Sequence, residues 1–183
     1  MLKNSLFYLL LIVQLISCDN NYRSGMVVSA KHEASKAGID ILKRGGNAFD
    51  AMIATDLALA VVYPNAGNLG GGGFMVYRLS DGKNGTLDYR EKAPINSKVD
   101  MYLDDNNQVI KGLSQNGALA IGVPGTIAGL FEIHDKFGSI PIKELFQPAI
   151  DLANNGYKLT SNQVNTINNY KDLILKLNDS IDL

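Results

Sequence analysis

The chain has 183 residues, of which 46% are hydrophobic, and its 17 basic and 18 acidic residues leave a formal net charge of −1. This length is enough for one domain with a hydrophobic core. No basic excess is present to neutralise phosphates, which argues against nucleic acid or an anionic membrane surface as the main partner. Cys18 is the only cysteine, so an internal disulfide and a cysteine zinc site are excluded.

The N-terminus has the pattern of an export signal. Lys3 precedes an apolar run at residues 6–16 that is too short to span a membrane. Leu15–Cys18 resembles a bacterial lipobox, in which the cysteine is acylated and becomes the first residue of the mature protein. We therefore expect residues 1–17 to be a signal peptide and residues 18–24 a lipidated tether. An ordinary cleaved signal that ends near a cysteine is the alternative.

The first elements after the tether are expected to be a strand and two helices. Met26–Ala30 is an apolar run that predicts a buried strand. Residues 34–42 repeat apolar side chains every three or four positions, which predicts a helix that Gly45–Gly46 ends. Residues 48–62 are almost wholly apolar, which predicts a helix in the protein core, and Pro64 ends it.

A helix cap and a hairpin come next. Asn47 is expected to cap the core helix, with Asp50 in the first turn, where an acidic side chain favours the helix dipole. Phe74–Leu79 and Thr86–Arg90 predict two strands joined by a tight turn. Residues 98–115 are polar and lack periodicity, so a loop is expected there.

The C-terminal part predicts one strand and three helices. Ala118–Val123 is a short apolar run that favours a strand, and a helix is expected at Thr126–Phe137. Another is expected at Ile142–Asn154, with a kink or a boundary at Pro148. Ser161 is the expected cap of the last helix. Strands together with helices predict an exported α/β domain.

A run of four glycines is the most unusual local feature: Gly70, Gly71, Gly72 and Gly73. Such a run costs backbone entropy on folding, but it lets the backbone pass close to a ligand or another segment. It lacks the Gly-Lys-Ser/Thr ending of a phosphate loop, and a helix precedes it where a dinucleotide fingerprint needs a strand. The spacing alone favours a tight helix-to-strand crossing without a direct role.

Arg90 lies at the end of the second predicted strand, beside Glu91. A guanidinium there can bind a carboxylate ligand in a bidentate manner. The spacing alone nevertheless favours a surface ion pair with Asp88 or Glu91. His32 and His134 are far apart in sequence, so a structural or exposed position is expected for each rather than a metal site.

Several segments, taken in order, resemble the γ-glutamyltranspeptidase family. The segments are Ala37–Ala51 (AG..IL..GGNA.DA), Gly67–Phe74 (G.GGGGF), Asp88–Pro94 (DYRE.AP), Ala120–Leu130 (A.GVPG..AGL), and Phe137–Ile150 with Ala153–Gly156. The resemblance covers about residues 25–163. It implies an α+β protein with the N-terminal-nucleophile hydrolase fold of four layers, αββα. Residues 25–183 would be the front part only, the N-terminal portion of the large subunit.

The resemblance also implies an activity. Members cut themselves into a large and a small subunit, and the new N-terminal threonine of the small subunit attacks the γ-glutamyl amide of glutathione or related compounds. The glutamyl group then passes to water, an amino acid or a peptide, and no metal or organic cofactor is implied. The small subunit carries the nucleophile, whose motif does not occur in these 183 residues.

The resemblance assigns roles to few residues of this chain. Arg90 matches the arginine that holds the α-carboxylate of the substrate, and Glu91 is expected to orient it. The glycines at 70–73 are expected to be close-packed scaffold near the site. We expect this chain alone to be inactive, because it lacks the nucleophile. We also expect it to be poorly soluble, because a partial sheet leaves an open edge and an uncovered apolar face. The alternative function is a truncated, non-catalytic envelope lipoprotein derived from the family.

Overall fold

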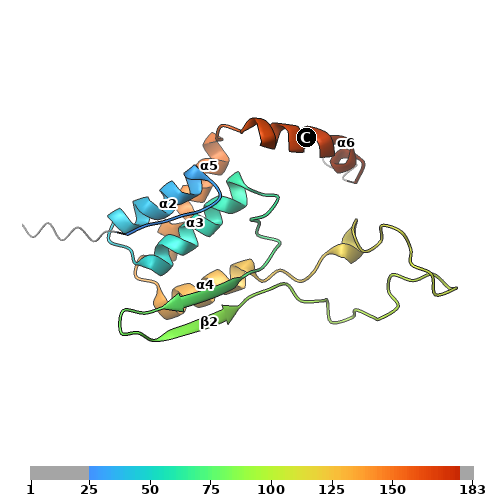
Figure 1. Cartoon of the computed structure of the whole chain (residues 1–183), viewed down its shortest axis with the longest axis horizontal. Coiled ribbons are helices and arrows are strands. Elements are labelled where there is room, and N and C mark those ends of the chain that lie inside the picture. The colour runs from blue at the N-terminus through green and yellow to red at the C-terminus, as the bar shows by residue number, and fades with distance from the viewer. Residues whose placement is uncertain (1–24, 178–183) are drawn as a thin grey trace, which may run out of the picture.

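The structure, a computed structural model, describes residues 25–177 and consists of helices packed on one face of a two-stranded sheet (Figure 1). The signal segment, the tether and Cys18 lie outside the described residues. The elements in order are α2 (His32–Lys43), α3 (Ala48–Val62), β1 (Phe74–Arg78), β2 (Asn84–Asp88), the 3-10 helix η1 (Ala118–Ala120), α4 (Thr126–Phe137), α5 (Ile142–Asn155) and α6 (Ser161–Leu177). The predicted α+β class is confirmed.

Helices α2 and α3 form a closely packed pair, as the sequence predicts. A Cβ at Gly38 of α2 would lie 2.3 Å from Thr55 Oγ1 of α3, so the two helices approach more closely there than a side chain would allow. The turn between them contains Gly45 in a left-handed conformation (φ +93°), and the N–H of Gly46 donates to the carbonyl of Ile41. These glycines end α2 in the expected way.

The N-terminus of α3 is held by a capping box. Asn47 Oδ1 accepts from the N–H groups of Phe49 and Asp50, and Asp50 Oδ2 accepts from Asn47 N. Asp50 is fully buried and also accepts from the backbone and hydroxyl of Ser139. Burial alone would raise the pKa of Asp50, but the hydrogen bonds from Ser139, Asn47 and Ile140 outweigh it and hold the pKa below its usual range. This carboxylate therefore ties α3 to the connection between α4 and α5.

The core lies between α3, α4, α5 and the inner face of the hairpin. Phe49 and Phe137 stack with their ring centroids 4.3 Å apart, and Tyr77 of β1 packs at 4.9 Å from Phe137. The buried members of this core are Ile41, Ile53, Ala54, Leu57, Met75, Leu130, Ile133, Leu145 and Ala149. The hairpin is therefore fixed to the helices by only one of its faces.

Strands β1 and β2 pair in antiparallel register, from Phe74 opposite Asp88 to Arg78 opposite Asn84. A turn with Gly82 at φ +89° connects them. Both strands were predicted, with ends that differ by one or two residues. The outward face of the sheet is open, since Phe74 is 60% and Val76 82% exposed.

Two predicted strands do not form. Met26–Ala30 is extended but pairs with no strand in the described chain, and Ala118–Val123 begins as η1 and contributes one isolated bridge, between Val123 and Lys92. A strand requires a partner to satisfy its backbone groups, and neither run has one along its length. Gly117, at φ +84°, also turns the chain just before η1.

The remaining elements follow the sequence more closely. Helix α5 runs through Pro148 without the predicted boundary; the carbonyl that loses its donor there belongs to Glu144, which is exposed to water. Thr160, rather than the predicted Ser161, caps α6 by a reciprocal pair of bonds with Gln163. Residues 91–117 form a long exposed arm that leaves the helices (Figure 1). None of the helices within residues 25–177 has the length and apolarity needed to cross a membrane.

Candidate functional site

The backbone around Arg90 is fixed on both sides by hydrogen-bonded pairs. Gly73 and Tyr89 exchange two bonds, with N···O distances of 3.4 and 3.0 Å. Lys92 and Val123 exchange two more, at 3.2 and 2.8 Å. Arg90 lies between these pairs, where the chain passes from the sheet into the arm. Its Cα position is therefore set by main-chain bonds on either side.

Two glycines, one before and one after Arg90 in the sequence, lie very close to this backbone. A Cβ at Gly72 would lie 2.6 Å from both Glu91 N and Tyr89 O, and a Cβ at Gly125 would lie 1.9 Å from Tyr89 O. Real Cβ atoms do not approach backbone so closely, so only glycine fits at either position. The glycine loop and the start of α4 thus enclose the segment that carries Arg90.

The four glycines of the run differ in what they require. Gly73 would place a Cβ 2.8 Å from the Tyr89 ring, whereas Gly70 would place one no closer than 3.4 Å to Asn68 Oδ1. The carbonyl of Gly71 accepts from the N–H of Gly125, the N-cap residue of α4, at 2.9 Å and from the N–H of Thr126, its first residue, at 3.1 Å. Positive φ angles occur at other glycines of the described chain but not in this run. Close contact, rather than an unusual backbone conformation, explains why glycine is required at positions 72 and 73.

Tyr89 anchors the strand end beneath α4. A Cβ at Gly129 would lie 2.3 Å from Tyr89 Cγ, so the helix lies directly against the ring. Burial, and to a lesser extent the negative charge of Asp56, raises the pKa of the Tyr89 hydroxyl. Burial likewise raises the pKa of Asp56. Tyr89 therefore points away from solvent while its neighbour Arg90 points outward.

The guanidinium of Arg90 is exposed and lies over an aromatic ring. Its Cζ is 5.6 Å from the ring centroid of Phe74, within the range of a cation–π interaction. The prediction of a surface ion pair, which the spacing favoured, is wrong, because within residues 25–177 Arg90 pairs with neither Asp88 nor Glu91. Asp88 instead accepts from the backbone N–H of Arg90, at 3.0 Å. The planar cation is thus positioned without a carboxylate of its own in the described chain.

Glu91 does not make the expected orienting contact with Arg90. In the described chain no hydrogen bond or ion pair joins the two side chains; the Glu91 carboxylate lies over Gly71 and its Cβ lies against Gly122. The described side chain in contact with the guanidinium is instead the ring of Phe74. Phe74 and Tyr89 were within the recognised motifs, but no periodicity marked them as neighbours of Arg90.

The histidines and the acidic groups do not form a metal centre among the described residues. His134 bonds through its ring to the carbonyl of Ile140 at 2.8 Å, which is a structural position, and His32 is exposed. Both positions agree with the sequence analysis.

Comparisons with known proteins place this arrangement in one family. The family model described as gamma-glutamyltranspeptidase matches residues 34–182. The chain is 51% identical over 144 residues to a glutathione hydrolase proenzyme of Pseudomonas sp. (strain A14) and 42% identical over 153 residues to that of Escherichia coli K12; these matches cover 79% and 84% of the chain. They cover only 25% and 26% of the relatives, so the chain spans about a quarter of their length.

The structural comparison agrees. A crystal structure of Helicobacter pylori γ-glutamyltranspeptidase matches with a TM-score of 0.82 at 44% identity, covering 87% of this chain and 46% of that one. The predicted fold, the front part only of an N-terminal-nucleophile hydrolase, is therefore confirmed. The chain belongs to the γ-glutamyltranspeptidase family.

Proposed function

We propose that this chain is the N-terminal part of an exported γ-glutamyltransferase, residues 25–183 being part of its large subunit. The whole enzyme cleaves the γ-glutamyl amide of glutathione and related compounds and transfers the glutamyl group to water, an amino acid or a peptide. The family membership and the proenzyme names of the relatives support this activity. The observation that carries the role of this chain is the exposed guanidinium of Arg90, which has no carboxylate partner within residues 25–177 and lies on a backbone that is closely packed on both sides.

In this proposal Arg90 binds the α-carboxylate of the glutamyl group through two parallel N–H···O bonds. The distance from that carboxylate to the γ-amide then fixes where the scissile carbonyl lies. A threonine hydroxyl of the small subunit attacks this carbonyl, the C–N bond breaks, and the amine leaves with a proton. Attack on the resulting ester by water or an amine regenerates the hydroxyl. Arg90 takes no part in the proton transfers.

Glu91 and the glycines at 70–73 serve as scaffold in this proposal. Gly72 and Gly73 leave the room in which the Tyr89–Glu91 backbone lies, and Gly71 holds the start of α4. Substitution at these positions would move Arg90 rather than remove a reacting group.

Residues 1–17 are proposed to direct export, and Cys18 to carry a lipid that anchors the tether at residues 18–24. The sequence pattern of Leu15–Cys18 supports this assignment. Metabolic labelling with a radioactive fatty acid tests it. Label in the expressed wild-type protein and none in Cys18→Ser is expected; an unlabelled wild type contradicts the lipid anchor.

The substrate role is tested in the full-length protein with Arg90→Lys. An ammonium cannot reproduce the bidentate contact, so we expect a loss of about 2 kcal/mol in substrate binding, or an increase of about 30-fold in KM for a γ-glutamyl anilide. Arg78→Lys is the matched control, because Arg78 is an exposed arginine of β1. Equal KM values for the wild type and Arg90→Lys would remove Arg90 from the site. Residues 25–183 alone are expected to show no turnover.

A further inference from the structure

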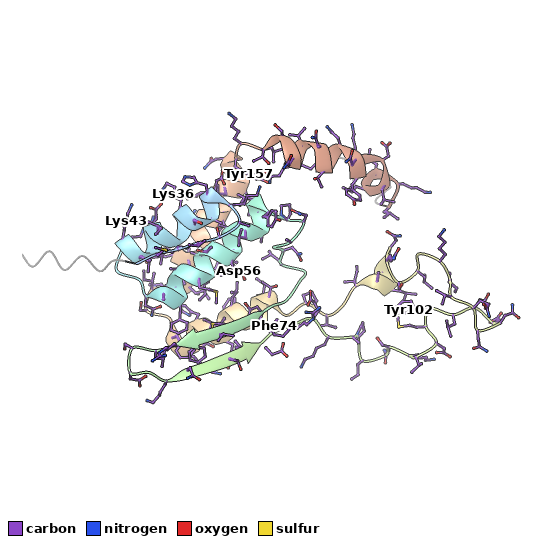
Figure 2. All side chains as sticks on the ribbon, in the orientation of Figure 1. Lys36, Lys43, Asp56, Phe74, Tyr102 and Tyr157 are labelled. Carbon is purple, nitrogen blue, oxygen red and sulfur yellow. The ribbon has the colours of Figure 1, made fainter. Side chains whose placement is uncertain are left out.

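Phe74 and Arg90 are placed side by side by one pair of backbone hydrogen bonds. Gly73 and Tyr89 exchange these two N–H···O bonds, and each of them is followed directly by one of the two residues. Phe74 lies opposite Asp88 in the ladder, so Arg90 is its diagonal neighbour on the same face of the hairpin. Figure 2 shows Phe74 at the end of the hairpin from which the long arm departs.

The ring of Phe74 packs on the cation rather than in the core. Arg90 Cζ lies 5.6 Å from the centroid of the ring, within the range of a cation–π interaction. Phe74 is 60% exposed, whereas the next residue, Met75, is buried in the hydrophobic core. Core packing therefore does not explain a large aromatic side chain at the start of β1.

The ring attracts the guanidinium without occupying its hydrogen-bond donors as a carboxylate would. An aromatic ring acts on the charge through its π face, whereas a carboxylate pairs with two N–H groups at once. Within residues 25–177 the guanidinium of Arg90 makes no hydrogen bond and no ion pair. Its fork of N–H groups is thus available to a carboxylate from outside this part of the chain.

The carboxylates nearest in the sequence are directed away from the guanidinium. Asp88 Oδ1 accepts from the backbone N–H of Arg90, at 3.0 Å, and the Glu91 carboxylate lies over Gly71. Either carboxylate would compete with an anionic ligand if it were paired with Arg90. Among the described residues, the cation is therefore held by an aromatic ring instead of by an acid.

We propose that Phe74 is a positioning residue for Arg90, and that its ring holds the guanidinium in the orientation that meets the α-carboxylate of the γ-glutamyl substrate. This inference rests on the proposed function of Arg90. An arginine side chain has several rotatable bonds, and ordering them on binding reduces affinity. A ring that orders the side chain beforehand removes part of that loss. Phe74 therefore acts on substrate binding and not on the transfer of the glutamyl group.

Steady-state kinetics of Phe74→Leu and Phe74→Tyr in the full-length protein test the positioning role. Leucine keeps the apolar bulk without a ring, so we expect KM for a γ-glutamyl anilide to rise about fivefold while kcat is unchanged. Tyrosine keeps the ring face, and its KM is expected to lie within about twofold of the wild-type value. Phe131→Leu is the matched control, because Phe131 is an exposed phenylalanine of α4; its KM is expected to be unchanged. Equal KM values for Phe74→Leu and the wild type, or equal increases for Phe74→Leu and Phe74→Tyr, overturn the proposal.

A double-mutant cycle with Arg90→Ala separates positioning from a general structural effect. Phe74→Leu is expected to lower kcat/KM about fivefold in the wild-type background and less than about 1.5-fold in the Arg90→Ala background, where no cation remains to be positioned. A fivefold loss in both backgrounds would mean that the ring acts independently of Arg90, which overturns the proposal.

The contact itself is tested by NMR of the full-length protein, without a measurement of activity. With ¹⁵N-labelled arginine, the side-chain Nε–H proton of Arg90 is assigned by its loss in Arg90→Lys. It is expected to lie upfield of its position in Phe74→Leu, because the ring current shields a proton over the ring face. Identical shifts in the two proteins overturn the contact. Unchanged KM in Arg90→Lys would remove the proposed function, whereas a raised KM in Arg90→Lys with an unchanged KM in Phe74→Leu would remove only this inference.

Discussion

The start and the middle of α3 place two aspartates in contrasting environments. At its start, Asp50 is fully buried and accepts hydrogen bonds from Asn47 and Ser139. Two turns later, Asp56 is partly buried and has no such donors within residues 25–177. The first environment lowers the carboxyl pKa and the second raises it. Within the described residues, the carboxylate of α3 next to α4 and α5 has hydrogen-bond donors, whereas the carboxylate next to the sheet has none.

The same contrast holds between the helix layer and the outer face of the sheet. Ile41, Ile53 and Leu130 are fully buried in the helix layer. On the sheet, Val76 is 82% exposed, and so is Val28 in the neighbouring extended segment. Apolar side chains gathered on one face mark a surface made for another layer. Within the described residues, the helices bury their apolar side chains against one another, whereas the outer face of the hairpin has no covering layer.

The largest expected effect is on the completed side of this comparison. Asp50→Ala removes the fully buried carboxylate that accepts from Asn47 N in the capping box of α3 and from the backbone and hydroxyl of Ser139. We expect a loss of about 3 kcal/mol in the free energy of unfolding, measured by urea titration. Asp81→Ala in the exposed hairpin turn is the control and is expected to change stability by less than about 0.5 kcal/mol. Similar losses of stability for Asp50→Ala and Asp81→Ala would show that the hydrogen bonds of Asp50 contribute no more to the free energy of unfolding than an exposed turn does.

Next in size is the contrast within the glycine run. Gly72→Ala places a methyl group against the Tyr89–Glu91 backbone and is expected to cost about 2 kcal/mol in the free energy of unfolding. Gly70→Ala has ordinary contacts and is expected to cost less than about 0.5 kcal/mol. Equal stabilities of the two variants by thermal melting would contradict the close packing at Gly72.

A smaller effect is expected at the open face of the sheet. We expect residues 25–183 to self-associate through it, and Val76→Lys to weaken that association about tenfold, because it removes about 1.5 kcal/mol of apolar burial. Ser80→Lys, in the exposed turn, adds the same charge away from the face and serves as control. Sedimentation equilibrium measures the association of the wild type and of both variants. A monomeric wild type would show that the exposed face does not drive self-association.

The smallest effect concerns the pH dependence of the two aspartates. The pKa of Asp50 is lowered by folding, so its stabilisation is present above about pH 3.9 and is lost as pH falls through the folded pKa. The pKa of Asp56 is raised, so its ionisation destabilises residues 25–183 as pH rises from about 3.9 through the folded pKa. Asp56→Asn removes this ionisation, so it is expected to raise Tm of residues 25–183 by an amount that grows between pH 4 and pH 7. A gain that is constant over this range would contradict the assignment.

Helices and the hairpin were predictable because their signals are local. Asn47 with Asp50, and Gly45 with Gly46, specify helix ends from neighbouring residues alone. The strands at Met26–Ala30 and Ala118–Val123 were not predictable in the same way, because pairing depends on a partner strand. The role of Arg90 was inferred from a family motif. Its contact with Phe74 arises from a cross-strand arrangement that sequence spacing does not reveal.

The central claim is that Arg90 recognises the α-carboxylate of a γ-glutamyl compound. The most direct measurement compares kcat/KM for a γ-glutamyl anilide with that for the same compound bearing an α-carboxamide, in full-length wild type and Arg90→Ala. The wild type is expected to prefer the carboxylate by about 100-fold, and Arg90→Ala to lose nearly all of that preference. An undiminished preference in Arg90→Ala would contradict the claim.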